Sequence, residues 1–358
     1  MGVAWAGGWA YCGTYEDAPR ESLFQLAVEP ASGRLTVAAA TAGVDRPSFL
    51  AAHPRGPWLY VVSEAPQAEG ALWAMAIGPA GALSPLTRRP AHGRLPCHIA
   101  VDPSARVLLA ANYGGPGVTA YRLDADGVPA HVATVVHHAG AGPHARQEGP
   151  HPHAAQVDRT GRFAYCPDLG ADRVMIYRLG TGRRLLAAAA PAFAGMPPGS
   201  GPRHLAFHPQ LPCAYVVCEL DSTVAVCAWD PATGALAVVQ TVSTLPEGAG
   251  VASAAAEVQV HPGGRFVYCT NRGHDSIAAF RVDPADGRLA LAAHVPSGGR
   301  TPRHCALDRD GRFLYVLNQD SDGISIFWVD PDSGVPQATG DGVRLPRPAC
   351  LCFSSPPA

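Results

Sequence analysis

Arginine, histidine and glutamate recur at corresponding places in this 358-residue sequence, next to short apolar runs. Arg203 and Glu219 flank one predicted hairpin, and Arg303 and His304 stand at the matching place in a later one. Guanidinium groups bind carboxylates and phosphates through paired hydrogen bonds, and a neighbouring His and carboxylate can exchange a proton. The combination predicts a site for a small anionic or polyhydroxylated ligand.

The candidate residues form two sets, one at the predicted starts of a first strand and one at the ends of the strand that follows it. The first set is His98, His151, His153, Arg203, His204, Glu257, Arg303 and His304. The second set is Glu64, Asn112, Asp168, Glu219, Asn271, Arg272, His274 and Gln319. A single histidine in such a place more often hydrogen-bonds a neighbouring loop, so the hypothesis rests on the sets as a whole.

The segment from His137 to Gln156, HHAGAGPHARQEGPHPHAAQ, is unusually rich in Gly, Pro and His. The His-x-His spacing of His151 and His153 can present two imidazoles to a metal ion. However, no Cys or carboxylate stands at a typical ligand spacing, and Pro152 restricts the geometry. We therefore predict no metal and no cofactor, and we interpret the segment as a lid or substrate-positioning loop.

The charge balance excludes other classes of function. With 27 basic against 29 acidic residues the net charge is −2, so the chain lacks the basic excess of a nucleic-acid-binding protein. The sequence contains no Lys, which excludes Schiff-base chemistry and a Lys-dependent phosphate loop. It also lacks a Gly-x-Ser-x-Gly elbow and a dinucleotide-binding fingerprint.

Cysteine usage and hydropathy indicate a compartment. The ten Cys are scattered without a C-x-x-C pair, mostly inside apolar runs such as CAYVVC, where Cys acts as a small buried hydrophobe. The beginning of the sequence lacks the basic region of a secretory signal, and no apolar run reaches the ~18–20 residues needed to span a bilayer. We expect a reduced cytoplasmic protein with no membrane partner.

An internal repeat identifies the elements that must position the candidate residues. Each copy has two alternating apolar runs joined by a polar turn, then a third run, then a turn such as DPATGAL before a fourth run. The first turn of each copy begins at His53, Asp102, Asp158, His208, His261 or Asp308. Four strands at a spacing of about 40–50 residues predict a β-propeller.

The two ends of the sequence complete each other. A truncated seventh copy, PACLCFSSP, starts at Pro348, and the chain begins in mid-unit with WAYCGTY, SLFQLAVEP and GRLTVAAAT. One C-terminal strand and three N-terminal strands would make a seventh blade and leave no open sheet edge. We predict an all-β, seven-bladed propeller that forms a single domain over residues 1–358.

Strand direction sorts the polar residues between the two faces of this propeller. Strands alternate in direction, so first-strand starts and second-strand ends lie together at the mouth of a central channel. The first turns lie on the opposite face and recur in nearly every unit. Recurrence suggests a structural role, so we expect His53, His208 and His261 to support turns.

Several motifs resemble the bacterial 6-phosphogluconolactonase family, a seven-bladed lactonase family that also includes fungal carboxy-muconate lactonising enzymes. The motifs are ANYGGPGV, GPHPH, PDLGADRV, GPRHLAFHP, CELDSTV, NRGHDSI and TPRHCALDRDGRFLYVLNQ, and they span nearly the whole chain. The resemblance implies metal-independent hydrolysis of 6-phosphogluconolactone in the oxidative pentose phosphate pathway. It also implies a catalytic cluster of His153 (or His151), Arg203, Glu219 and Arg272.

The expected mechanism is attack of water on the lactone carbonyl. Glu219 or His153 would act as general base, Arg203 and Arg272 would stabilise the oxyanion, and the remaining candidates would bind substrate. The expected substrate-binding residues are His151, His204, Asn112, Glu257, Asn271, His274, Arg303 and His304. Alternatives are a muconate-type cycloisomerase, a lactonase for a non-phosphorylated lactone and a non-catalytic interaction platform. We expect a monomer or weak homodimer.

Overall fold

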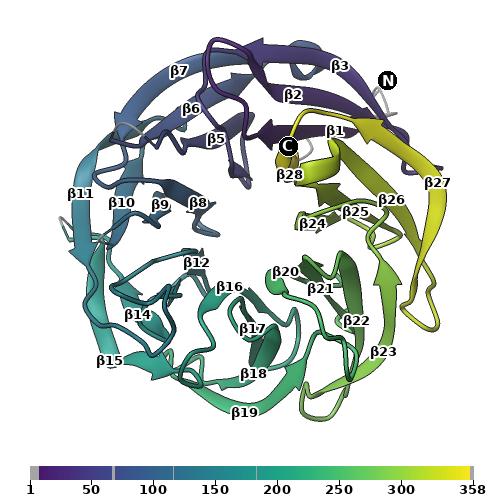
Figure 1. The fold of residues 1–358 in the computed structure, drawn as a ribbon. Helices are drawn as coiled ribbons and strands as arrows, with labels where there is room; N and C mark the ends of the chain where they lie inside the picture. The colour runs from purple at the N-terminus through teal and green to yellow at the C-terminus, as the bar shows by residue number, and fades with distance from the viewer. Residues whose placement is uncertain (1–7, 67–68, 116, 183, 355–358) are drawn as a thin grey trace.

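The computed structural model describes residues 8–66, 69–115, 117–182 and 184–354. Within them the chain forms seven four-stranded sheets arranged around a central axis (Figure 1). This confirms the predicted all-β seven-bladed propeller. The expectation that one domain covers all of residues 1–358 stays a prediction, because both ends of that range lie outside the described residues.

Each blade runs from an inner strand beside the axis to an outer strand at the rim (Figure 1). The first three blades are β4 (Leu50–Ala52), β5 (Trp58–Ser63), β6 (Ala71–Ile77) and β7 (Leu83–Pro90); β8 (Pro96–Val101), β9 (Val107–Asn112), β10 (Gly117–Leu123) and β11 (Pro129–His137); and β12 (Gln156–Val157), β13 (Phe163–Asp168), β14 (Arg173–Leu179) and β15 (Leu186–Gly195). The next three are β16 (Pro202–Phe207), β17 (Cys213–Cys218), β18 (Thr223–Trp229) and β19 (Leu236–Ser243); β20 (Ala254–Val260), β21 (Phe266–Arg272), β22 (Ser276–Val282) and β23 (Leu289–Pro296); and β24 (Pro302–Leu307), β25 (Phe313–Asn318), β26 (Gly323–Val329) and β27 (Pro336–Arg344). Two short 3-10 turns, η1 (Pro79–Gly81) and η2 (Gln319–Ser321), lie between strands.

The seventh blade joins the two ends of the chain, as predicted. Its order is β28 (Pro348–Phe353), β1 (Gly8–Thr14), β2 (Glu21–Val28) and β3 (Leu35–Ala42). Leu351 pairs with Cys12 across the β28–β1 boundary. The pairing satisfies backbone groups that would otherwise form open sheet edges.

The core lies between blades. Each of seven clusters of buried apolar side chains joins two neighbouring sheets. Nine of the ten cysteines are buried, and all ten are free thiols, as expected for small apolar residues. No helix within the described residues is both long enough and apolar enough to cross a membrane.

A hydrogen bond that recurs around the ring fixes the position of several blades against the next. Tyr215 Oη donates to the carbonyl oxygen of Gly287 in the following blade, at 2.9 Å. The same bond joins Tyr60 to Gly127, Tyr165 to Gly234, Tyr268 to Gly334 and Tyr315 to Gly33. Gly287 has φ = +79°, a conformation that side-chain-bearing residues rarely adopt, which explains the glycine of the DP-x-x-G turns.

The turn histidines behave as expected of structural residues. His208 Nδ1 accepts from the amides of Gln210 and Leu211, at 3.0 and 2.8 Å. His261 and His53 likewise accept an amide two residues further along their own turns. These imidazoles therefore order the face opposite the channel mouth.

Candidate active site

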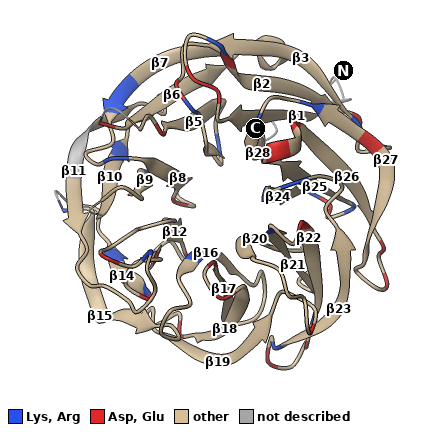
Figure 2. Cartoon of the chain, in the orientation of Figure 1, with Lys and Arg blue, Asp and Glu red and all other residues tan. Residues whose placement is uncertain are grey.

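A β-bulge at the start of several inner strands directs side chains toward the axis. In β16 the pairing with β17 shifts between Pro202 and His204, so Arg203 has no residue opposite it. The same shift leaves Cys97 unpaired in β8 and Arg303 unpaired in β24. A bulge bends its strand and re-aims the extra side chain. Figure 2 shows a basic segment on β16 and on β24 beside the axis.

Glu219 gathers three arginines. Its Oε2 lies 3.0 Å from Arg203 Nε and 2.8 Å from Arg272 Nη2, and its Oε1 lies 2.6 Å from Arg146 Nη1. Burial alone would raise the pKa of Glu219, but Arg272, Arg203 and Arg146 lower it to about 2. A carboxylate with this pKa, with both oxygens in ion pairs, is a weak base. Glu219 therefore serves as the anchor of an arginine cluster.

Contacts on Nε and Nη1 hold the buried guanidinium group of Arg203 in place. Its Nε contacts Glu219, and its Nη1 donates to the carbonyl oxygen of Ala256 at 2.6 Å and lies 3.3 Å from His204 Nε2. Among the described residues no hydrogen bond is recorded to Nη2, which leaves that nitrogen for a ligand. Burial, with Arg303 and Arg272 nearby, lowers the pKa of Arg203 to about 10. The group stays cationic at neutral pH.

Arg146 is a member of this cluster that sequence reasoning missed. It belongs to the segment between β11 and β12, in which only the histidines drew attention. Besides Glu219 it contacts Tyr113, whose hydroxyl accepts from Nη2 at 3.2 Å. The signal available in the sequence was an arginine inside the most unusual loop, on the predicted mouth face.

The residues that directly follow the bulge residues are histidines, and they pack with an aromatic ring. The Phe49 and His98 rings stack with centroids 4.1 Å apart, and both lie within 6 Å of His204. Glu257 Oε2 lies 3.0 Å from His204 Nδ1 and 3.5 Å from His304 Nε2. The imidazoles of His204 and His304 are thus engaged with a carboxylate of this chain, and their contact with substrate stays a prediction.

Burial governs ionisation in this deeper layer. It lowers the pKa of His98 and His204 well below the ordinary histidine value, and it lowers that of His304 to about 4. Burial raises the pKa of Glu257. Glu257 accepts the Nδ1 proton of a neutral His204, so His204 Nε2 keeps a lone pair facing Arg203. Glu257 therefore fixes the tautomer of His204 that holds Arg203, and its contact with a ligand stays a prediction.

His153 lies beside the arginine cluster. Its Nδ1 is 3.7 Å from Cys97 Sγ, and its ring meets those of His204 and Tyr113 edge to face at 5.3 and 5.4 Å. Burial, reinforced by Arg203, lowers the pKa of His153 well below the ordinary value, so its imidazole is neutral. No hydrogen bond to Nε2 is recorded from the part of the chain that the structure describes. His151 stacks on Tyr113 at 4.6 Å, closer to solvent.

Arg303 occupies another side of the axis. Its guanidinium group lies over the Tyr15 ring, 4.9 Å from the centroid, and Tyr15 donates to Glu64 Oε2 at 3.0 Å. Ser48 also donates to Glu64. Within the described residues no hydrogen bond or ion pair is recorded for the Arg303 guanidinium itself, so its donors can serve a ligand.

Three predicted site residues point away from the cluster. The Asn271 amide donates to the carbonyl oxygen of Thr244, the Asn112 amide donates to that of Ala91, and His274 Nδ1 lies 2.7 Å from Ser276 Oγ. Successive side chains of a strand face opposite ways, so Arg272 reaches Glu219 while Asn271 faces into the blade. Tyr113, in the turn that follows β9, contacts Arg146 and joins the site instead of Asn112.

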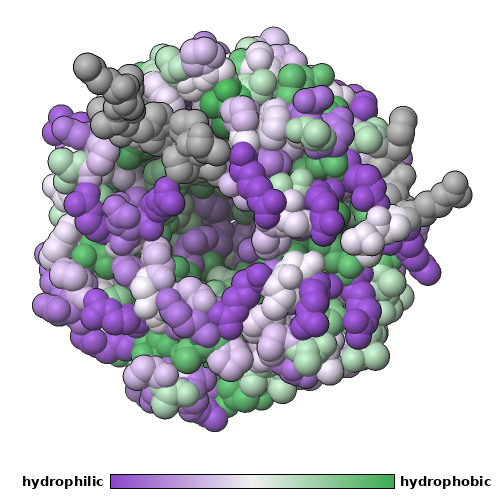
Figure 3. Space-filling model, turned by 180° about the vertical axis from the view of Figure 1, so that it is seen from behind, coloured by the Kyte–Doolittle hydropathy of each residue, from purple (hydrophilic) through white to green (hydrophobic). Residues whose placement is uncertain are grey.

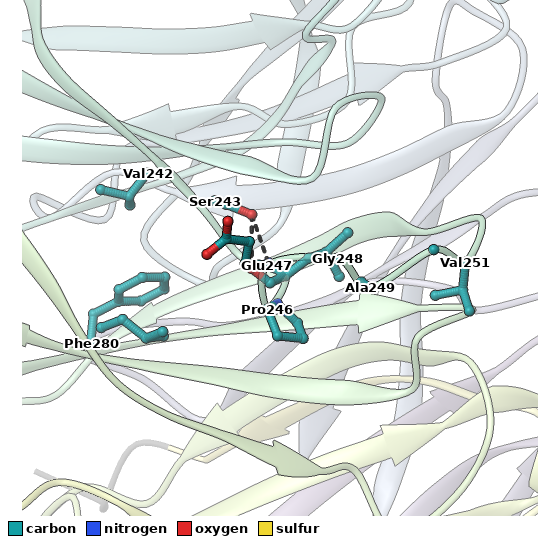
Figure 4. A pocket seen from close by; sticks show the side chains of 11 residues that line it. Val242, Ser243, Pro246, Glu247, Gly248, Ala249, Val251 and Phe280 are labelled. Carbon is teal, nitrogen blue, oxygen red and sulfur yellow. Dashed lines mark hydrogen bonds between the residues drawn. The ribbon is translucent and has the colours of Figure 1, made fainter.

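A metal site or another hollow would be an alternative to the axial cluster in the part of the chain that the structure describes. No group of three or more His, Cys, Asp or Glu side chains among the described residues is placed to hold a metal ion. A cleft of about 910 Å³ between β19 and β23 has mostly apolar walls (Figure 4). Its lining offers one titratable side chain, Glu247, and no arginine or histidine. In the view from behind, which shows the face opposite the inner-strand starts, a hollow opens at the centre of the ring (Figure 3).

Comparison with known proteins gives a consistent family. The family described as "Lactonase, 7-bladed beta-propeller" matches residues 9–353. The chain is 32% identical to a 6-phosphogluconolactonase of Bacillus subtilis, over 96% of this chain and 97% of that protein.

Solved structures agree with this result. A periplasmic gluconolactonase of Pseudomonas aeruginosa superposes with a TM-score of 0.92 at 32% identity, covering 98% of this chain and 99% of that one. A putative 6-phosphogluconolactonase of Bacteroides fragilis gives a TM-score of 0.91 at 25% identity, covering 99% of each chain.

Proposed function

The chain belongs to the seven-bladed β-propeller lactonase family, and on that premise we propose that it hydrolyses 6-phospho-D-glucono-1,5-lactone to 6-phosphogluconate. The family match confirms the resemblance seen in the sequence, and lactone hydrolysis follows from the family. The observation that supports an anionic substrate is the positive charge of the axial cluster, in which Arg146, Arg203 and Arg272 share the single carboxylate of Glu219. The excess positive charge suits both an anionic substrate and an oxyanion.

His153 is the preferred general base. The Cys97 thiol lies 3.4 Å from the carbonyl oxygen of His153 and can donate there, while its sulfur accepts the Nδ1 proton of the imidazole. That arrangement leaves a lone pair on Nε2 to receive a proton from water. Glu219, the other base considered from the sequence, is a poorer choice because three arginines hold its pKa near 2.

The reaction then proceeds in two balanced steps. Water adds to the lactone carbonyl as His153 takes its proton, and the resulting oxyanion is stabilised by Arg203 Nη2 with Arg272. The intermediate collapses with cleavage of the bond between the carbonyl carbon and the ring oxygen, and the ring oxygen takes the proton from His153. The product is an open-chain acid, and the free histidine is restored.

A substrate panel tests this proposal. The purified protein would be assayed with 6-phosphogluconolactone, gluconolactone and a carboxylated muconolactone, each with and without a chelator. We expect the highest kcat/KM with the phosphorylated lactone and no effect of the chelator. A preference for the muconolactone would overturn the sugar-lactone assignment, and loss of activity on chelation would overturn metal-independent hydrolysis.

A non-phosphorylated sugar lactone is the second candidate substrate. It is favoured by the structural similarity to the periplasmic gluconolactonase of Pseudomonas aeruginosa. The panel distinguishes the two, because a gluconolactonase would have equal or greater kcat/KM without the phosphate. The cytoplasmic location and the monomeric or weakly dimeric state remain predictions, which fractionation and sedimentation would test.

A further inference from the structure

We infer that Arg146 is the specificity-determining residue that binds the phosphate of the substrate, an inference that rests on the proposed function. Its side chain is 46% exposed, against 2% for Arg203 and 16% for Arg272. Arg146 thus lies at the outer edge of the cluster whose buried members face the lactone. A lactone seated against Arg203 would extend its phosphate-bearing carbon outward, toward this edge.

The exposed position suits a phosphate group. A phosphate dianion is strongly hydrated, so binding at a half-exposed arginine costs less desolvation than binding at a buried one. Nη1 of Arg146 contacts Glu219 and Nη2 contacts the Tyr113 hydroxyl, yet each Nη carries a second hydrogen that can donate to a phosphate oxygen. Because Tyr113 accepts from Arg146, its own hydroxyl hydrogen is also available to the anion.

The loop that carries Arg146 is fixed to the framework that carries Arg203. Gln147 is buried next to it, and its Nε2 donates to the carbonyl oxygen of Leu169 at 2.8 Å and to Asp172 Oδ1 at 2.7 Å. The same Asp172 oxygen accepts from the amide of Gly201 at 2.9 Å, just before β16. These bonds favour a positioning loop over a mobile lid, and a preformed site loses little entropy on binding.

Asp168 of β13 forms a second anchor, which contacts the loop at both His138 and His151. Asp168 Oδ2 lies 2.6 Å from His138 Nδ1, and Asp168 Oδ1 accepts from the amide of His151 at 2.8 Å. His138 and Asp168 have fully buried side chains, and Tyr177 Oη lies 2.9 Å from His138 Nε2. The segment that we interpreted as a lid or substrate-positioning loop thus uses its histidines and a buried glutamine to place one arginine.

The test compares two substrates in three proteins. We would measure kcat/KM with 6-phosphogluconolactone and with gluconolactone for the wild type, Arg146→Gln and Arg300→Gln. Arg300 is an exposed arginine before β24 that donates to the carbonyl oxygen of Asp320, so it serves as a matched control. We expect Arg146→Gln to lower the ratio of the two kcat/KM values by about 10- to 100-fold, the loss of one charge-assisted contact, and Arg300→Gln to preserve it.

Inorganic phosphate gives a second readout, because its inhibition constant should rise by a similar factor in Arg146→Gln only. An equal loss on both substrates would overturn the inference, since it would mean that Arg146 acts only through Glu219. An unchanged ratio would overturn it as well. A wild type without preference for the phosphorylated lactone would instead overturn the proposed substrate, so the two failures are distinguishable.

Discussion

Two groups of histidines in this molecule have opposite surroundings. His208 and His261 lie in turns and accept hydrogen bonds from the backbone of those turns. His153 and His204 lie at the axis and contact side chains from other blades. The first group lies on the face opposite the channel mouth, whereas the second lies at or before the start of an inner strand: His204 within β16 and His153 ahead of β12. In this propeller, a histidine that bonds backbone groups of the turns builds a blade, whereas a histidine that contacts side chains of other blades beside the axis belongs to the candidate site.

Replacing His153 would test that distinction most strongly. His153→Ala removes the proposed base, so kcat/KM should fall by about 10²- to 10⁴-fold. Steady-state assays with the preferred lactone would measure it. The His151→Ala variant is the comparison, because His151 lies nearer solvent and should lose far less. A larger loss in His151→Ala would transfer the role of base to that residue.

Removing Arg203 should have the next largest effect. Arg203→Ala deletes the donor assigned to the oxyanion, and we expect kcat to fall by about 10²- to 10³-fold. Circular dichroism and thermal unfolding would establish that the variant is folded. Unchanged lactonase activity in a folded Arg203→Ala protein would reject the assignment.

The pH dependence of the wild type should differ from that of an ordinary histidine enzyme. Burial lowers the pKa of His153, and the base works only when neutral, so activity should persist as pH falls through 6.5. The acid limb of kcat/KM should therefore lie below pH 6.5. A limb centred at or above that value would contradict a buried neutral base.

A turn histidine should affect stability and leave catalysis intact. His208→Ala removes two acceptor contacts to backbone amides and a contact between Nε2 and the carbonyl oxygen of Gly264. We expect the free energy of unfolding to drop by about 1–3 kcal/mol, measured by urea titration, with kcat/KM within twofold of wild type. A large loss of kcat/KM in His208→Ala would contradict the distinction between turn histidines and axial histidines.

Sequence reasoning predicted the architecture because the repeat encodes it directly. Turn residues, strand alternation and the matching ends of the chain all depend on local pattern, and these specified seven blades and their closure. The site was harder, because its residues meet through bulges and side-chain direction. Arg203, Glu219 and Arg272 converge as expected. Asn271 and Asn112 do not, since alternation turns each of them away from the neighbour that faces the axis.

Contacts between distant segments explain what the sequence could not provide. Arg146 contacts Glu219 from an irregular loop that the Gln147–Asp172 hydrogen bond helps to hold, and a periodic sequence pattern does not predict such a bond. Likewise, the role of Glu257 depends on which nitrogen of His204 it meets. Residue type and register placed Glu257 at the mouth. Its control of the His204 tautomer became visible only from the distance between Glu257 Oε2 and His204 Nδ1.

The β28–β1 pairing has a consequence for synthesis of the protein on the ribosome. Tyr15, which underlies Arg303, donates its amide hydrogen to the carbonyl oxygen of Arg347, and Cys350 Sγ lies 3.7 Å from His304 Nε2. β28, which is translated after the other strands that the structure describes, therefore forms part of the wall around the axis. The reaction centre therefore cannot be complete until residues near 350 have left the exit tunnel.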